Sequence, residues 1–123
     1  MVSGALKDQT EAVIGSAFEV LNILGHGLLE KPYEQALVVE LQLRGIAVMQ
    51  QARFPVMYKG IKVGDYVPDL IAFDAIIIEV KTVDHIDQQS IGQVLNYLSI
   101  TGLTVGLILN FKRPRLDWKR VSR

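Results

Sequence analysis

The sequence contains no cysteine, which excludes disulfide bonds and thiolate chemistry. This absence is compatible with a reducing compartment, and we expect a cytoplasmic location. Every apolar run is far shorter than the roughly 20 residues that cross a bilayer, so we expect no membrane partner. The first residues also lack an extended apolar stretch, and we therefore expect no secretory signal.

A net charge is absent as well, because 13 basic residues balance 13 acidic ones. The charges are uneven, however: residues 112–123 contain six basic residues and one acidic residue, which leaves a net charge of −5 on residues 1–111. A basic strip of this kind is equally typical of a phosphate-binding surface and of a solvated C-terminus. Its cations Arg113, Arg115 and Lys119 are candidates for contacts with nucleic acid.

The 123 residues, half of them apolar, predict one domain, residues 1–123, with one hydrophobic core. Apolar residues recur at helical spacing in three segments and form short runs between turn residues elsewhere. The predicted helices are residues 9–24, 28–43 and 90–101, and the predicted strands are residues 54–58, 61–67, 70–73, 76–78 with a continuation to 81, 105–111 and 114–121. Thr10 is a candidate cap for the first helix, Asp87 or Ser90 for the third, and Gly64 indicates a bend or bulge.

Two of these strands carry charged residues at neighbouring ends. Side chains alternate along a strand, so Glu79 and Lys81 share one face of theirs. A two-residue turn between the strands sets Asp69 opposite Val80, whereas a three-residue loop of residues 73–75 sets Asp69 opposite Glu79. We expect the three-residue loop, which brings two carboxylates and an ammonium together.

Such a cluster on an otherwise apolar sheet is costly unless the charges are compensated. Two carboxylates about 4 Å apart repel each other by roughly 4 kcal/mol at an effective dielectric constant of about 20. A hard divalent cation such as Mg²⁺ offsets this repulsion best, because it accepts one or two carboxylates and retains several waters. The simpler alternative is a hairpin that contains a cross-strand ion pair and performs no chemistry.

Pro68-Asp69, nine intervening residues and Glu79-Val80-Lys81 resemble the signature of the PD-(D/E)XK nuclease superfamily. Residues 27–33, Gly-Leu-Leu-Glu-Lys-Pro-Tyr, are similar to the motif that names its GxxExxY branch. The similarity continues through residues 58–60, 93–98, 105–111 and 114–116. The resemblance implies an α/β fold with a restriction-endonuclease-like core, in which helices flank a mixed central β-sheet.

The same resemblance implies roles for the charged residues. Asp69 and Glu79 are expected to bind Mg²⁺ or Mn²⁺ together with the Val80 carbonyl, and Lys81 is expected to be the catalytic lysine. The spacing of Glu34, Leu37, Leu41 and Gly45 is similar to that in the first helix of archaeal Holliday-junction resolvases, whose helix glutamate joins the metal site. This similarity makes Glu34 the preferred third acid of the metal site, with Glu30 as the second choice.

Gln93 and Tyr97 lie four residues apart and therefore on one face of the third helix. They resemble the Gln-x-x-x-Tyr pattern of recombination-type exonucleases in the superfamily, where these residues lie near the active site. We count both among the candidate nucleic-acid-binding residues.

These observations predict a metal-dependent nuclease that hydrolyses DNA phosphodiester bonds with an activated water. The alternative is a catalytically inactive nuclease fold that binds nucleic acid or protein. RNA is a weaker candidate substrate, because only Tyr97 and Trp118 are available as aromatic platforms for single strands. The acidic body of the chain binds phosphates weakly by itself, so a homodimer or another partner is also expected.

Overall fold

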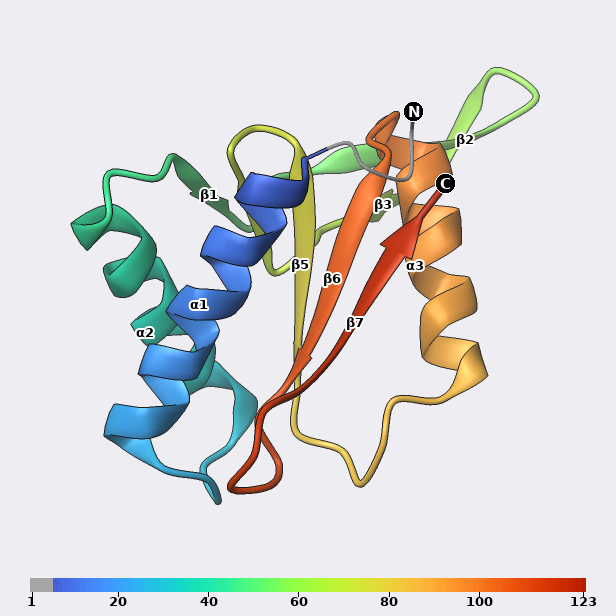
Figure 1. Ribbon diagram of the computed structural model, residues 1–123. Helices are drawn as coiled ribbons and strands as arrows, with labels where there is room; N and C mark the ends of the chain where they lie inside the picture. The colour runs from blue at the N-terminus through green and yellow to red at the C-terminus, as the bar shows by residue number, and fades with distance from the viewer. Residues whose placement is uncertain (1–5) are drawn as a thin grey trace.

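A computed structural model describes residues 6–123 of the chain (Figure 1). The elements are α1 (Lys7–Leu24), α2 (Glu30–Leu43), β1 (Val48–Gln50), β2 (Phe54–Tyr58), β3 (Ile61–Tyr66), β4 (Leu70–Ala72), β5 (Ile76–Lys81), α3 (Gln88–Thr101), β6 (Val105–Asn110) and β7 (Asp117–Ser122). One five-stranded sheet has the order β1-β4-β5-β6-β7, and β2 and β3 form a separate hairpin. The β5–β6 pair is parallel and the other pairs are antiparallel, so the predicted α/β fold with a mixed central sheet is confirmed.

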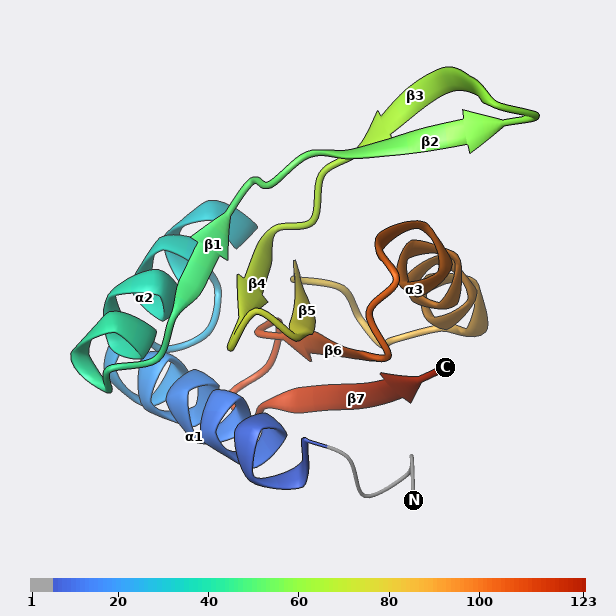
Figure 2. The same cartoon turned by 90° about the horizontal axis from the view of Figure 1, so that it is seen from above.

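Helices cover both faces of the central sheet, α1 and α2 on one side and α3 on the other (Figure 2). Side chains alternate along β5, so that Ile76, Ile78 and Val80 join the core under α1 and α2. Ile77 points the opposite way, into the core under α3. By the same alternation, Glu79 and Lys81 lie on the α3 face. The sheet therefore places these two charged side chains in the layer between β5 and α3.

Gly106 on β6 lies in close contact with α3. A Cβ atom at this position would lie 2.7 Å from the Cγ1 atom of Val94 on α3. We expect Gly106→Ala to lower the free energy of unfolding by about 1–3 kcal/mol, because valine is stiff and the sheet below is fully buried. Urea unfolding of Gly106→Ala, Val94→Ala and the double variant checks this, and strictly additive losses would contradict the contact.

The predicted loop between β4 and β5 is confirmed. Ala72 pairs with Ile76 and Leu70 pairs with Ile78, which leaves residues 73–75 as the loop. Phe73 and Asp74 both have positive φ values, 58° and 54°, as a tight reversal of the chain requires. Asp69 directly precedes β4, and the register therefore sets it opposite Glu79.

Other local predictions had mixed outcomes. Asp87 caps α3 as predicted, since its side chain accepts a hydrogen bond from the Ser90 N–H group. The register shift of the β2–β3 hairpin lies beside Gly64, where the second strand contains the extra residue. The prediction that Thr10 caps α1 is wrong, because the helix begins earlier, at Lys7. The Thr10 hydroxyl instead donates a hydrogen bond to the carbonyl of Lys7 within the helix.

The strand β1 was not predicted, because its three residues are too few to show an alternating pattern. The last strand is confirmed as an edge strand, but it begins at Asp117 after an irregular loop. Within residues 6–123, no helix has the length and apolar character needed to cross a membrane. The expectation about a secretory signal falls largely on residues 1–5, which lie outside the described residues.

Candidate active site

Asp69 lies in the short connection between β3 and β4, directly after Pro68, which has no N–H group to donate to a strand ladder. Its Oδ2 atom accepts a hydrogen bond of 2.8 Å from the N–H group of Val80 on β5. Burial raises the pKa of the Asp69 carboxyl, the bond from Val80 opposes this shift, and the charges of Glu34 and Glu30 add to it. Asp69 is therefore fixed to β5 in an environment that disfavours its charge.

Glu79 lies beside Asp69 on the α3 face of the sheet. Its Oε2 atom accepts a hydrogen bond of 2.5 Å from the hydroxyl of Tyr66, the last residue of β3. Burial raises the pKa of Glu79 to about 7, the bond from Tyr66 and the charge of Lys81 lower it, and the charge of Asp69 raises it. Burial and the charge of Glu79 also raise the pKa of Tyr66, so that its hydroxyl remains a proton donor at neutral pH.

The raised pKa of Glu79 predicts a pH-dependent stability. In the unfolded chain Glu79 titrates near 4.5, so the folded state holds its proton over a wider pH range. The free energy of unfolding should therefore fall as the pH rises from about 4.5 to about 7, and this group contributes a decrease on the order of 3 kcal/mol. Urea unfolding at several pH values checks this. The decrease should be smaller in Glu79→Gln, and equal slopes in both proteins would contradict the shift.

Lys81 extends from the end of β5 on the same face as Glu79. Its positive charge lowers the pKa values of both Asp69 and Glu79. Within the described part of the chain, however, Lys81 forms no ion pair or hydrogen bond with either carboxylate. The simple cross-strand ion pair considered from the sequence is therefore not present as a direct contact.

Glu34 lies in the second turn of α2 and is only 5% exposed. Its Oε2 atom accepts hydrogen bonds from the side-chain amides of Gln50, at 2.8 Å, and Gln51, at 3.0 Å. The Lys31 ammonium lies 3.4 Å from the same oxygen. The two glutamines were missed from the sequence, because they follow α2 by several residues and no motif marks them.

The three acids share one feature. In Asp69, Glu79 and Glu34, one carboxylate oxygen accepts the hydrogen bonds just described, while the other accepts none from residues 6–123. Each carboxylate is thus fixed by one oxygen and retains a second for a cation or for water. Residues 6–123 nevertheless contain no group of three or more acidic or histidine side chains that is placed to hold one metal ion.

Two carboxylates and a nearby backbone carbonyl are donors of the kind that a divalent cation accepts without a third acid. Mg²⁺ accepts one or two carboxylates and fills its other positions with carbonyl oxygens and water. The bond from the Val80 N–H group holds Asp69 beside Val80, the residue whose carbonyl was predicted as a ligand. Glu34 and Glu30 act on Asp69 through their charges, and their direct contact with a metal remains a prediction.

The Gly-x-x-Glu-x-x-Tyr motif connects the start of α2 to the sheet. Tyr33 is fully buried, stacks on Phe111 with ring centroids 4.6 Å apart, and donates a hydrogen bond of 2.7 Å to the carbonyl of Gly25. Glu30 is exposed and accepts a hydrogen bond of 3.1 Å from the N–H group of Thr82, just beyond β5. The motif therefore holds α2, and with it Glu34, against the end of β5.

Of the predicted α3 residues, Tyr97 reaches the site. Its ring stacks on Tyr66 with centroids 3.7 Å apart and an angle of 15° between the planes. Burial, followed by the charge of Glu79, raises the pKa of Tyr97. Gln93 lies one helical turn away and is exposed. Tyr66, which links Tyr97 to Glu79, was not identified from the sequence.

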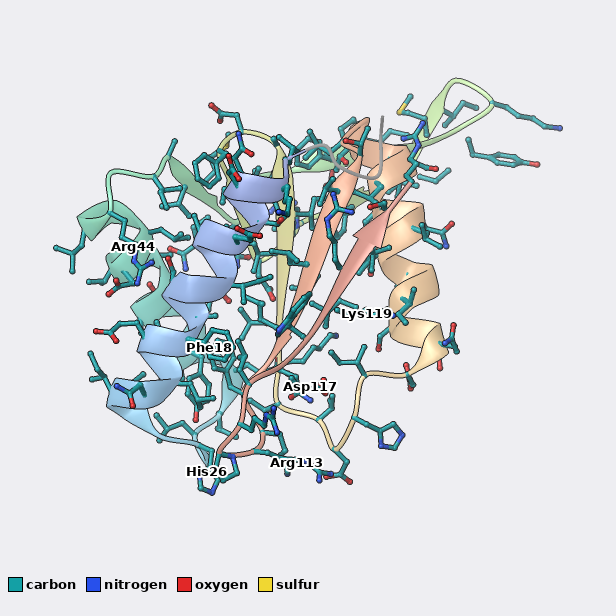
Figure 3. All side chains as sticks on the ribbon, in the orientation of Figure 1. Phe18, His26, Arg44, Arg113, Asp117 and Lys119 are labelled. Atoms are coloured by element: carbon teal, nitrogen blue, oxygen red, sulfur yellow. The ribbon has the colours of Figure 1, made fainter. Side chains whose placement is uncertain are left out.

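Of the predicted basic residues, Arg113 and Lys119 lie on different parts of the surface (Figure 3). Arg113 and Arg115 line a cavity of about 440 Å³ in the loop before β7, at the sheet end that also contains Lys81. Arg113 donates a hydrogen bond of 2.9 Å to the carbonyl of Asp84. Lys119 is exposed on β7 and pairs with Ile108, whose side chain faces α3. A single basic face is therefore not formed by these three cations.

Comparisons with known proteins concern the family and the fold of the chain. A family model described as PD-(D/E)XK nuclease superfamily matches residues 7–121. The crystal structure of SSO0001 superposes on the chain with a TM-score of 0.52 at 16% sequence identity. The match covers 96% of this chain and 60% of that protein, so the chain spans less than two thirds of it. This likeness supports a restriction-endonuclease-like core. No curated protein matches the sequence.

Proposed function

Because the chain belongs to the PD-(D/E)XK nuclease superfamily, we propose that it is a metal-dependent nuclease that hydrolyses DNA phosphodiester bonds. The observation that carries this proposal is the pairing of Asp69 and Glu79, each fixed by one oxygen and free at the other. We also assign residues 1–123 to one catalytic domain of the GxxExxY branch, whose motif connects α2 to β5.

In this proposal Asp69, Glu79 and the Val80 carbonyl hold one Mg²⁺ or Mn²⁺ ion, with Glu34 as the preferred third acid and Glu30 as the second choice. When bound, such an ion activates a water for attack and neutralises charge on the phosphate. Tyr66 and the Val80 N–H group hold the two carboxylates in place. Lys81, which has no ion-pair partner among residues 6–123, is available to orient the attacking water or to stabilise the phosphate charge.

The nucleic acid is proposed to lie against the layer between β5 and α3. Tyr97 approaches Glu79 from the α3 side through Tyr66, Gln93 is proposed to contact the nucleic acid one helical turn away, and Arg113 and Arg115 are proposed to extend the contact surface beyond Lys81. Because these cations are few, a homodimer is proposed to supply further phosphate contacts.

The direct test is incubation of the purified protein with labelled linear, nicked and branched DNA, with Mg²⁺, Mn²⁺ or EDTA. We expect cleavage that requires the metal, and a matched RNA substrate measures the preference for DNA. Absence of cleavage on all substrates, together with unimpaired binding of DNA, would instead support the inactive nuclease fold that binds nucleic acid.

A further inference from the structure

Gln51 has an unusual backbone conformation. Its φ value is 60°, which lies in the left-handed region that residues other than glycine rarely adopt. The other such residues between positions 6 and 123 lie at the start of α1 (Leu6) or in hairpin turns (Lys59, Phe73 and Asp74). Gln51 instead lies in the connection between β1 and β2, where no hairpin turn requires the conformation. A strained residue in such a position suggests a functional use.

The contacts of Gln51 join the two acid-bearing segments. Its side-chain amide donates to Oε2 of Glu34 at 3.0 Å, and its backbone N–H group donates to the carbonyl oxygen of Asp69 at 3.3 Å. Its neighbour Gln50 donates to the same oxygen of Glu34. In an extended strand, successive side chains point to opposite faces. The left-handed turn at Gln51 interrupts this alternation, and both amides therefore reach one carboxylate.

We propose that Gln51 is a positioning residue that fixes Glu34 relative to Asp69 and keeps one oxygen of Glu34 directed toward the metal site. This inference rests on the proposed function. Fold stability alone explains the arrangement less well, because Gln50 and Lys31 already contact the same oxygen. The Gln51 residue is moreover exposed, so its side chain contributes little to the core.

The variant Gln51→Gly distinguishes a role of Gln51 in positioning Glu34 from a role in stabilising the fold. Glycine adopts a positive φ freely, so the substitution removes the strain together with the amide. Replacement of a residue that orients a metal-binding group typically weakens metal affinity by about 10–100-fold. We therefore expect Mn²⁺ binding, followed by the electron paramagnetic resonance signal of free Mn²⁺, to weaken at least about tenfold. The melting temperature should change by only a few degrees.

Lys59→Gly is the matched control, because Lys59 has a φ of 49° in the hairpin turn away from the acids. It should leave Mn²⁺ affinity unchanged. Gln51→Asn keeps an amide and tolerates the left-handed conformation, but its side chain is one methylene shorter. We expect it to bind Mn²⁺ as weakly as Gln51→Gly.

Equal Mn²⁺ affinity of the wild type and Gln51→Gly would overturn the inference while leaving the proposed nuclease intact. A much larger loss of melting temperature in Gln51→Gly than in Lys59→Gly would also overturn it, since Gln51 would then be a structural brace. Absence of Mn²⁺ binding by the wild type would overturn the proposed metal site itself, and this inference with it.

Discussion

Replacement of Glu79 by glutamine should strongly reduce the rate of DNA cleavage while leaving the folded protein at least as stable at pH 8. Glutamine has nearly the same shape, but its amide carries no charge to compensate a cation. The loss should be on the order of a thousandfold, because metal-assisted stabilisation of the phosphate contributes several kcal/mol. Stability should be preserved, because burial and the charge of Asp69 both disfavour an ionised side chain here.

Cleavage rates, Mn²⁺ affinity and urea unfolding at pH 8 together test this expectation. Glu19→Gln provides a control on α1, which lies on the opposite face of the sheet. It removes the same charge and should change none of the three measurements appreciably. Cleavage by Glu79→Gln at the wild-type rate would refute the assignment of Glu79 to the metal site. A loss of activity accompanied by an equal loss of folded protein would give no support to a catalytic role.

The part of the site that could be predicted from the sequence depends on local rules. The period of two along a strand places Glu79 and Lys81 on one face, whatever surrounds them. The lengths of the two apolar runs limited the β4–β5 connection to two registers, and the observed pairing of Ala72 with Ile76 is the predicted one. These relations involve residues close together in the chain, where geometry leaves few alternatives.

The residues that sequence reasoning missed depend on tertiary packing. Tyr66 precedes Asp69 by only three residues, yet it reaches Glu79 only because the hairpin base packs between the sheet and α3. An aromatic residue at the end of the strand that leads to Asp69 was the available signal. Gln50 and Gln51 approach Glu34 only because β1 adds to the edge of the sheet, and a three-residue strand has no periodicity to reveal this.

The charge pattern of the sequence was also an incomplete guide to the surface. Residues 112–123 are strongly basic in composition, but β7 presents successive side chains to opposite faces of the sheet. Lys119 therefore faces the α3 side, whereas Trp118 and Arg120 line a cavity with α1. A run of basic residues becomes a basic surface only where the backbone keeps the side chains on one side.

Replacement of Lys81 by methionine should separate chemistry from metal binding. Methionine keeps the length of the apolar stem but carries no charge, and we expect the cleavage rate to fall by about 10²–10³-fold, as when one electrostatic group is removed from an active site. Mn²⁺ should bind at least as tightly, because a positive charge close to Asp69 and Glu79 is gone. Stability should be nearly unchanged, since Lys81 forms no ion pair with residues 6–123 that would be broken.

Single-turnover cleavage and the Mn²⁺ titration check this, with Lys59→Met in the distant hairpin turn as the control. Weakened Mn²⁺ binding by Lys81→Met, in proportion to its loss of activity, would show that Lys81 acts by organising the carboxylates and not on the phosphate.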